Sequence, residues 1–345
     1  MNEVLIRIEG NAGRITLNRP DALNALTYAM VEHIETALLA WRDDPKVKLV
    51  VVDATGDRAF CAGGDIAKMY ETAKAGDFDY GRRFWRDEYR LNAMIATFPK
   101  PFISFMQGYT MGGGVGIACH GSHRIVCENS KIAMPECSIG LIPDVGGTLL
   151  LANAPGHLGE YLALSGDQMQ AGDAIFAGFA TGFIPITKWP TAIEELVNSG
   201  TTDVIDQVSE TPETGKLQQA MAEIDLHFDG ASAGEIATNV RDAKTIDHLG
   251  AKLLRACPLS AACAIELIHM VRKKPTIEYA LQMEYRFTSR SASDGDFIEG
   301  IRAAVIDKDR KPHWRHDSIG DVTLNEVSHM LSPLGKEELN LGETR

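Results

Sequence analysis

Short apolar or β-rich runs alternate with amphipathic segments along the first 190 residues. The β-rich runs at 4–9 and 13–17 flank a turn-forming Gly-Asn-Ala and predict a hairpin. Between Thr27 and Trp41, apolar residues recur at helical spacing, and Thr27 is suited to cap that helix. The apolar run 49–52 predicts a buried strand, and a glycine turn follows at 61–65. The pattern therefore predicts a hairpin that leads into a strand, helix and strand unit.

The same order recurs over the next hundred residues. A mostly helical stretch at 66–98 is stopped by Pro-Lys-Pro, and a second glycine turn lies at 112–114. The remaining predicted strands are 102–105, 124–127 and 131–134, and further helices begin at Val115 and Gly146. Because strands alternate with helices, we expect an α/β layered fold with its ligand crevice where strands end in glycine turns.

Beyond about residue 190 the composition changes to long polar helical runs, at 191–198, 216–224 and 235–241. We therefore divide the chain into a core that carries the site, 1–190, and a helical C-terminal region, 191–345. A mobile stretch is expected at 199–215. Two further helices are predicted at 258–273 and 276–289. The last thirty residues are polar and are expected to lie at the surface.

The composition is that of an ordinary soluble protein, with 345 residues, 45% hydrophobic and 23% charged. A net charge of -13 argues against nucleic-acid and anionic-membrane partners, so a polyanionic ligand would need a local basic pocket. The six cysteines form no Cys-x-x-Cys pair, which favours reduced, buried thiols. A strand-like N-terminus and the lack of an apolar run of about 18 residues predict a cytoplasmic protein.

Two carboxylates interrupt the apolar, Gly/Pro-punctuated segment 134–147. Glu136 and Asp144 lie where an uncompensated charge is costly, which indicates a chemical role. The alternatives are a surface capping acid for Glu136 and a plain helix N-cap for Asp144. A third acid, Glu88, lies in a charged helical stretch, where a solvated salt-bridge partner is the default interpretation.

The two glycine turns are candidates for oxyanion stabilisation. Bare amides of Gly64 and Gly113 at strand ends could hold the negative charge that develops on a thioester carbonyl. The alternative is that both turns only permit tight packing of strand against helix. The sequence has no His-Glu-x-x-His, Gly-x-Ser-x-Gly or P-loop motif, so we expect no metal, serine-hydrolase or nucleotide-triphosphatase chemistry.

Three motifs make the chain resemble the crotonase (enoyl-CoA hydratase/isomerase) superfamily: the segment 18–26, Phe-Cys-Ala-Gly-Gly-Asp at 60–65, and the glycine triplet with its Met-Pro-Glu sequel. This resemblance implies a crotonase-like spiral of repeated ββα units, an acyl-CoA substrate and an oxyanion hole from Gly64 and Gly113. It also implies a homo-oligomer as one option, and contacts to CoA from Ala22, Leu23, Ala25, Ala62 and Asp65.

Within that family the chain departs from the hydratases at two positions. The glutamate that hydratases carry after the glycine triplet is Gly116 here, and Asp144 stands where their pattern usually has glycine. Together with the segment 297–309, this is similar to the 3-hydroxyisobutyryl-CoA hydrolase branch. The resemblance implies hydrolysis of a short β-hydroxyacyl-CoA by Glu136 and Asp144, with no cofactor beyond the substrate's own CoA. It places Glu88, Gly113, Glu136 and Asp144 against the substrate.

Two alternatives remain open at this point. One is another crotonase-type activity, such as enoyl-CoA hydration or isomerisation, and the other is a non-catalytic acyl-CoA-binding protein.

Overall fold

The computed structural model describes residues 2–242 and 255–342. By compactness the chain forms two units, each built from three segments. The first unit consists of 1–64, 90–133 and 168–218, and the second consists of 65–89, 134–167 and 219–345. These interleaved units do not coincide with the division at residue 190, which describes a change of composition and stays a prediction.

The first unit contains two sheets, and the strands from β3 to β8 alternate between them along the chain. The larger has the order β1-β2-β3-β5-β7-β9 and the smaller the order β4-β6-β8. Among the named strands of the described residues, β1 and β2 pair antiparallel, as the hairpin predicts, and the other strand pairs are parallel. The bounds are β1 Val4–Glu9, β2 Ala12–Leu17, β3 Leu49–Ala54, β4 Ala59–Cys61, β5 Phe102–Met106, β6 Tyr109–Met111, β7 His123–Val126, β8 Lys131–Ala133 and β9 Gly182–Phe183.

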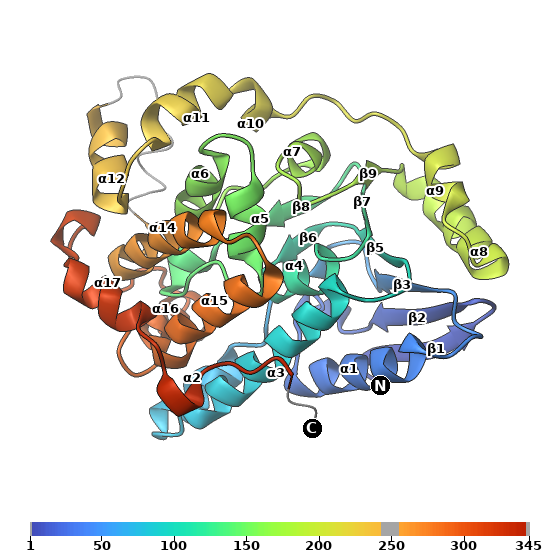
Figure 1. Ribbon diagram of the computed structural model, residues 1–345, viewed down its shortest axis with the longest axis horizontal. Coiled ribbons are helices and arrows are strands. Elements are labelled where there is room, and N and C mark those ends of the chain that lie inside the picture. Colours follow the sequence, from blue (N-terminus) through green and yellow to red (C-terminus); the bar gives the residue numbers. More distant parts are fainter. Residues whose placement is uncertain (1, 243–254, 343–345) are drawn as a thin grey trace. The chain divides into compact units, whose positions relative to one another are not determined.

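Three successive passes of the chain, from β3 to β8, each add one strand to each of these sheets. The pairs β3/β4, β5/β6 and β7/β8 place their first strands side by side in one sheet and their second strands side by side in the other (Figure 1). This is a spiral of repeated strand pairs, and it confirms the predicted α/β class. The strands β4, β6 and β9 were not predicted, because segments of two or three residues are too short to show alternation.

The first helix of the first unit, α1, follows its sequence signal. The predicted cap is confirmed, because the Thr27 hydroxyl accepts a hydrogen bond of 3.3 Å from the Met30 N–H. The helices of this unit are α1 Tyr28–Arg42, α4 Gly113–Ala118, α7 Ala171–Phe176, α8 Trp189–Ser199, α9 Asp203–Val208 and α10 Lys216–Gln219, with the 3-10 turns η1 Pro20–Ala22 and η3 Ile186–Lys188. The stretch 199–215 was predicted to be mobile, and the structure shows that it contains a helix, α9. Helix α9 forms there because Val204 and Ile205 join the core that packs on the sheet.

The second unit is mainly helical. Helix α14 packs against α5, α6, α15 and α17 (Figure 1). The bounds are α2 Ala67–Lys74, α3 Asp79–Ala96 (which runs on into the first unit), α5 Gly147–Asn153, α6 Leu158–Ser165, α11 Met221–Phe228, α12 Ala233–Asp242, α14 Pro258–Lys273, α15 Ile277–Ser291, α16 Phe297–Ile301 and α17 Leu324–Leu331. The shorter elements are the 3-10 turns η2 Glu136–Ile139, η5 Ile319–Asp321 and η6 Gly335–Glu337, and the π-helix η4 Arg302–Ile306.

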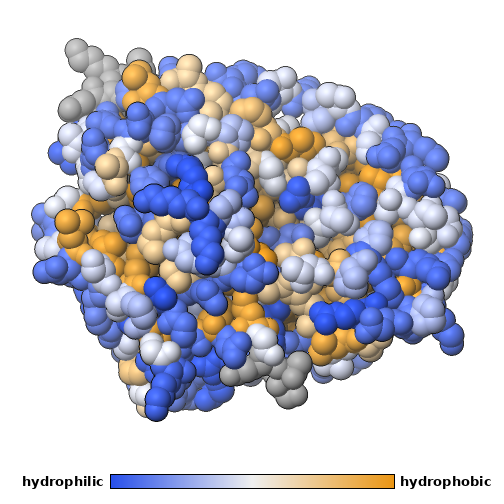
Figure 2. Space-filling view, in the orientation of Figure 1, coloured by the Kyte–Doolittle hydropathy of each residue, from blue (hydrophilic) through white to orange (hydrophobic). Residues whose placement is uncertain are grey.

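The last described residues are more buried than their polar composition predicts. Helix α17 begins with a capping box between Thr323 and Glu326, and Met330 and Leu331 at its end are buried. Polar and apolar side chains are interspersed on the face shown in Figure 2. All six cysteines are free and buried, as predicted. Among the described residues, no helix combines the length and apolar character that a membrane crossing requires.

Candidate active site

In the turn after β4, the N–H of Gly64 points away from the neighbouring segment, which contains Leu26. Leu26 forms a parallel bridge with Gly64, and its N–H donates a 2.9 Å hydrogen bond to the Gly63 carbonyl. In a parallel bridge the bonds go to the residues flanking the paired one, so the N–H of Gly64 faces the other way. Gly63 has φ +114°, which favours glycine at this position.

The second glycine turn opens helix α4 beside the first. Gly113 is the first helical residue, where the N–H has no acceptor within the helix. A Cβ on Gly114 would lie 2.3 Å from the Cys61 carbonyl oxygen, so the helix packs directly on the end of β4. A Cβ on Gly63 would lie 3.6 Å from the Met111 carbonyl oxygen. The packing alternative therefore explains Gly114, while the turns that carry the predicted amides of Gly64 and Gly113 are neighbours.

The loop assigned to CoA is held against the first of these turns. Leu23 and Asn24 adopt positive φ values of 51° and 55°, and the Ala62 N–H donates a 3.0 Å hydrogen bond to the Leu23 carbonyl. The Asn24 side-chain amide donates to the carbonyls of Thr55 and Ala59 at 3.0 and 2.9 Å. The first unit thus brings together Ala22, Leu23, Ala25 and Ala62, whereas Asp65 belongs to the second unit. Their contact with CoA stays a prediction.

The three predicted acids are buried in the second unit. Glu88, Glu136 and Asp144 are 3%, 5% and 4% exposed. A surface capping role for Glu136 and a solvated salt bridge for Glu88 are therefore wrong. Oε1 of Glu88 and Oε2 of Glu136 have no hydrogen-bond partner among the described residues. Buried carboxyl oxygens without a partner are costly, and a substrate or water could satisfy them.

Burial changes the acid strength of all three carboxyl groups. It raises the pKa of Glu136 well above its usual range, and the charge of Asp144 raises it further. The same two causes raise the pKa of Glu88. Burial raises the pKa of Asp144 to about 7, against the lowering effect of a hydrogen bond from Tyr89. A carboxyl group with a pKa of about 7, such as that of Asp144, can exchange protons near neutral pH, as general acid–base chemistry requires.

Asp144 is not the cap of the helix that follows it. The N-cap of α5 is Gly146, and the Asp144 side chain instead accepts a 2.7 Å hydrogen bond from the Tyr89 hydroxyl. The N–H groups of Gly146 and Thr148 donate to the carboxylate of Glu284 at 2.8 and 3.0 Å. The capping alternative for Asp144 is therefore wrong, because Glu284 takes that place.

Tyr89 and Glu284 were not predicted as parts of the site. Tyr89 adjoins Glu88 in the charged stretch and carries no signal of its own. Glu284 did carry a signal, because it falls on the apolar face of its helix with Ile277, Leu281 and Thr288, at helical spacing. An acid on a core-facing position is costly without partners, and that conflict marks Glu284 for attention.

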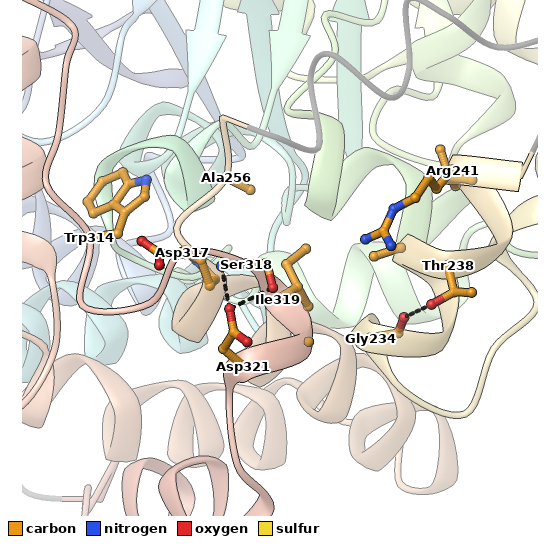
Figure 3. A pocket seen from close by; sticks show the side chains of 13 residues that line it. Gly234, Thr238, Arg241, Ala256, Trp314, Asp317, Ser318, Ile319 and Asp321 are labelled. Atoms are coloured by element: carbon orange, nitrogen blue, oxygen red, sulfur yellow. Dashed lines mark hydrogen bonds between the residues drawn. The ribbon is translucent and has the colours of Figure 1, made fainter.

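Two cavities in the second unit are not lined by Glu88, Glu136 or Asp144. One, of about 470 Å³, lies between α12 and the segment 314–321, and Figure 3 shows Arg241 and Trp314 on its walls. The other, of about 680 Å³, is lined by several arginines. Arg82 and Arg86 in this cavity are bonded to the Ser289 carbonyl and the Tyr285 hydroxyl. The basic pocket expected for a polyanionic ligand therefore stays a prediction.

Comparison with known proteins places this arrangement in a family. The enoyl-CoA hydratase/isomerase family model matches residues 12–331. The mitochondrial 3-hydroxyisobutyryl-CoA hydrolase of Gallus gallus is 35% identical over 98% of this chain and 91% of its own length. The enzyme of the same name from Danio rerio is 36% identical over 99% of this chain and 92% of its own length.

Solved structures agree with the fold. An enoyl-CoA hydratase from Rhodobacter sphaeroides 2.4.1 has a TM-score of 0.95 and 50% identity, covering 98% of this chain and 100% of its own. A carnitinyl-CoA dehydratase from Mycobacterium thermoresistibile has a TM-score of 0.94 and 37% identity, covering 100% of both chains. The predicted crotonase-like fold is thus confirmed. The chain belongs to the enoyl-CoA hydratase/isomerase family, whose members are enzymes that process CoA esters.

Proposed function

We propose that this enzyme hydrolyses short β-hydroxyacyl-CoA thioesters, with 3-hydroxyisobutyryl-CoA as the preferred substrate. The products are 3-hydroxyisobutyrate and CoA, a step of valine catabolism. One observation carries the proposal: Glu136 and Asp144 are both buried in the second unit, and the charge of Asp144 raises the pKa of Glu136. The name shared by the Gallus gallus and Danio rerio relatives supports the same substrate.

In the proposed reaction the N–H groups of Gly64 and Gly113 hold the thioester oxygen. Donors of this type are each worth about 2.7–4 kcal/mol in transition-state stabilisation. Glu136, in its ionised form, either removes a proton from water or attacks the thioester carbon to give a mixed anhydride. Either route adds one water, breaks the carbon–sulfur bond and releases the CoA thiol. Asp144 orients the water or the substrate hydroxyl, and no further cofactor is needed.

Oxygen-18 distinguishes the two roles of Glu136. A single turnover in labelled water leaves label in the Glu136 carboxyl group if an anhydride forms and opens at the enzyme's carbonyl. Label found only in the product acid is expected for direct attack by water and also for an anhydride that opens at the acyl carbonyl, so label in Glu136 is the decisive result.

A second candidate is enoyl-CoA hydration, which the name of the Rhodobacter sphaeroides protein favours. Against it, the helix after the glycine triplet carries Gly116, so the carboxylate that the hydratase pattern expects there is missing. Asp144 and Glu88 supply buried acids elsewhere in the second unit.

Thiol release separates these functions. The test measures free CoA with a thiol reagent across a panel of 3-hydroxyisobutyryl-, 3-hydroxypropionyl- and crotonyl-CoA, together with the loss of enoyl absorbance. Hydrolysis releases thiol from the hydroxyacyl substrates, whereas hydration consumes crotonyl-CoA with no thiol. An enzyme that releases no thiol from any of them contradicts the proposal. The cytoplasmic location and the homo-oligomer remain predictions from the sequence.

A further inference from the structure

We propose that Glu284 is a positioning residue for Asp144: its carboxylate fixes the backbone just behind Asp144 and so aims that side chain. The inference rests on the proposed function for its catalytic consequence, although its structural part can be tested without catalysis. Neither the family resemblance nor the acids predicted from sequence include this residue.

The carboxylate of Glu284 is fully buried and both of its oxygens are used. Oε2 accepts a 2.8 Å hydrogen bond from the Gly146 N–H, and Oε1 accepts one of 3.0 Å from the Thr148 N–H. The Thr148 hydroxyl also donates to Oε1. All three donors come from residues two to four positions after Asp144. Helix α15 is thus bound, through Glu284, to the residues that directly follow Asp144.

The backbone at 145–146 has a conformation that requires support from the surrounding structure. Val145 has φ +54°, and Gly146 follows with φ +78°. A β-branched residue in the left-handed region is a true outlier, and such a conformation persists only where the surroundings enforce it. Here Tyr89 binds the Asp144 side chain on one side of Val145, and Glu284 binds Gly146 and Thr148 on the other.

The hydrogen bonds require two acceptor oxygens on a side chain of this length. A glutamine would turn its NH₂ group toward one of the two backbone donors, and an aspartate would be one methylene too short to reach both. The charged or titratable groups that act on this cluster are Asp144, Glu136 from η2 and Tyr89 from α3. Burial raises the pKa of Glu284 to about 8, while the bonds from Thr148 and Gly146 oppose that rise.

The experiment compares Glu284→Asp with a matched control, Glu160→Asp. Glu160 is also a fully buried glutamate of the second unit, but Arg272 holds it at 2.6 and 3.1 Å. Thr148→Val is the milder third variant, because it removes one donor to Glu284 and keeps every charge. Each variant is assayed for kcat and KM by thiol release. The Asp144 titration is followed by carbon-13 NMR of carboxyl-labelled protein without substrate, with Asp144→Asn to assign the signal.

We expect Glu284→Asp to lower kcat at least about 10-fold with KM within about 3-fold, since a ~1 Å misplacement costs up to 10²-fold. The Asp144 titration should move to higher pH in Glu284→Asp and Thr148→Val, because the lowering effect of the Tyr89 hydrogen bond weakens. Glu160→Asp should lower only the melting temperature. Unchanged kcat and an unchanged Asp144 titration in the folded Glu284 or Thr148 variant overturn the inference.

The two proposals fail in distinguishable ways. If the unaltered enzyme releases no thiol, the proposed function is wrong, and the NMR titration alone then decides the positioning role. If Glu284→Asp does not fold, Thr148→Val decides it.

Discussion

The hydroxyl of Tyr89 donates a 2.7 Å hydrogen bond to Oδ2 of Asp144 within the buried acid cluster of the second unit. This bond lowers the pKa of Asp144, while burial raises it, and the balance leaves the value at about 7. The Tyr89 hydroxyl therefore contributes to the protonation state of Asp144 near neutral pH, beside burial and a backbone hydrogen bond. A change at Tyr89 should be visible in the pH dependence of the reaction.

Tyr89→Phe removes that donor and keeps the ring. We expect the pKa of Asp144 to rise above 7, so the rise of kcat with pH should move to higher pH and activity at pH 7 should fall about 10-fold. The measurement is thiol release from pH 5 to 9. Tyr285→Phe is the control, because its ring packs edge-on against Tyr89 at 6.3 Å while its hydroxyl binds Arg86. A profile equally shifted in both variants would contradict a specific role of the Tyr89 hydroxyl.

Glu136→Gln and Asp144→Asn test the acids directly. Each substitution keeps the size of the side chain and removes its proton-accepting carboxylate. General acid–base groups contribute about 10²–10⁴-fold, so we expect losses of kcat in that range with acyl-CoA binding retained. Calorimetric titration with a slowly reacting acyl-CoA checks the binding. Near-full hydrolysis by Asp144→Asn would remove Asp144 from the mechanism.

The same Asp144→Asn variant should gain stability above neutral pH. The pKa of Asp144 is about 7 in the folded state against an ordinary 3.8, so the folded chain holds a proton that the unfolded chain has lost. Stability from this group is complete below about pH 4 and is lost as the pH rises toward 7. Asparagine does not titrate, so the variant should be more stable by about 1–4 kcal/mol at pH 8 and nearly equal at pH 4. Urea unfolding at both pH values measures the difference. Equal stability at pH 8 would contradict the raised pKa.

Gly113→Pro isolates one amide of the proposed oxyanion hole. Gly113 is the first residue of α4, the position where proline fits a helix and no helical hydrogen bond is lost. The substitution should remove the N–H without unfolding the helix, and we expect kcat to fall about 10²–10³-fold. Thermal unfolding confirms that the protein remains folded. Full activity in a folded variant would assign the oxyanion role to another donor.

Regular elements were predicted well because their signals are local. Threonine caps mark the starts of α1 and α15, and Pro258 marks the start of α14, whose bounds agree with the prediction. The misses have a different cause. Helix α9 depends on Val204 and Ile205 meeting a core built from distant strands, and a six-residue helix has too little pattern of its own.

The candidate site was predictable where an acid interrupts an apolar segment. Glu136 and Asp144 stand out because charge in such a segment is costly. The position of Glu284 on an apolar helix face was a signal, but which groups would bind to it, or to Asp144, was not predictable. Tyr89 and Glu284 act through hydrogen bonds between residues 55 and 138 positions apart in the chain, and no local spacing reports such pairs.

The segment 297–309, which the family resemblance singled out, also supports the proposed site. Gly300 of α16 lies so close to η2 that a Cβ would be 2.0 Å from the Ile139 carbonyl oxygen. The turn η2 begins at Glu136, so a methyl group at Gly300 should displace the turn that carries this acid.

We therefore expect Gly300→Ala to lower kcat at least about 10-fold through displacement of Glu136. Gly320→Ala is the matched control, because its nearest neighbour in the described residues, the Ser318 hydroxyl, is 3.7 Å from the new Cβ. The thiol-release assay and thermal unfolding are measured for both variants. If Gly300→Ala loses stability and its folded fraction keeps the original kcat, α16 holds the fold together without aiming Glu136. A loss of kcat at unchanged substrate affinity instead shows that the segment 297–309 positions Glu136 for the reaction.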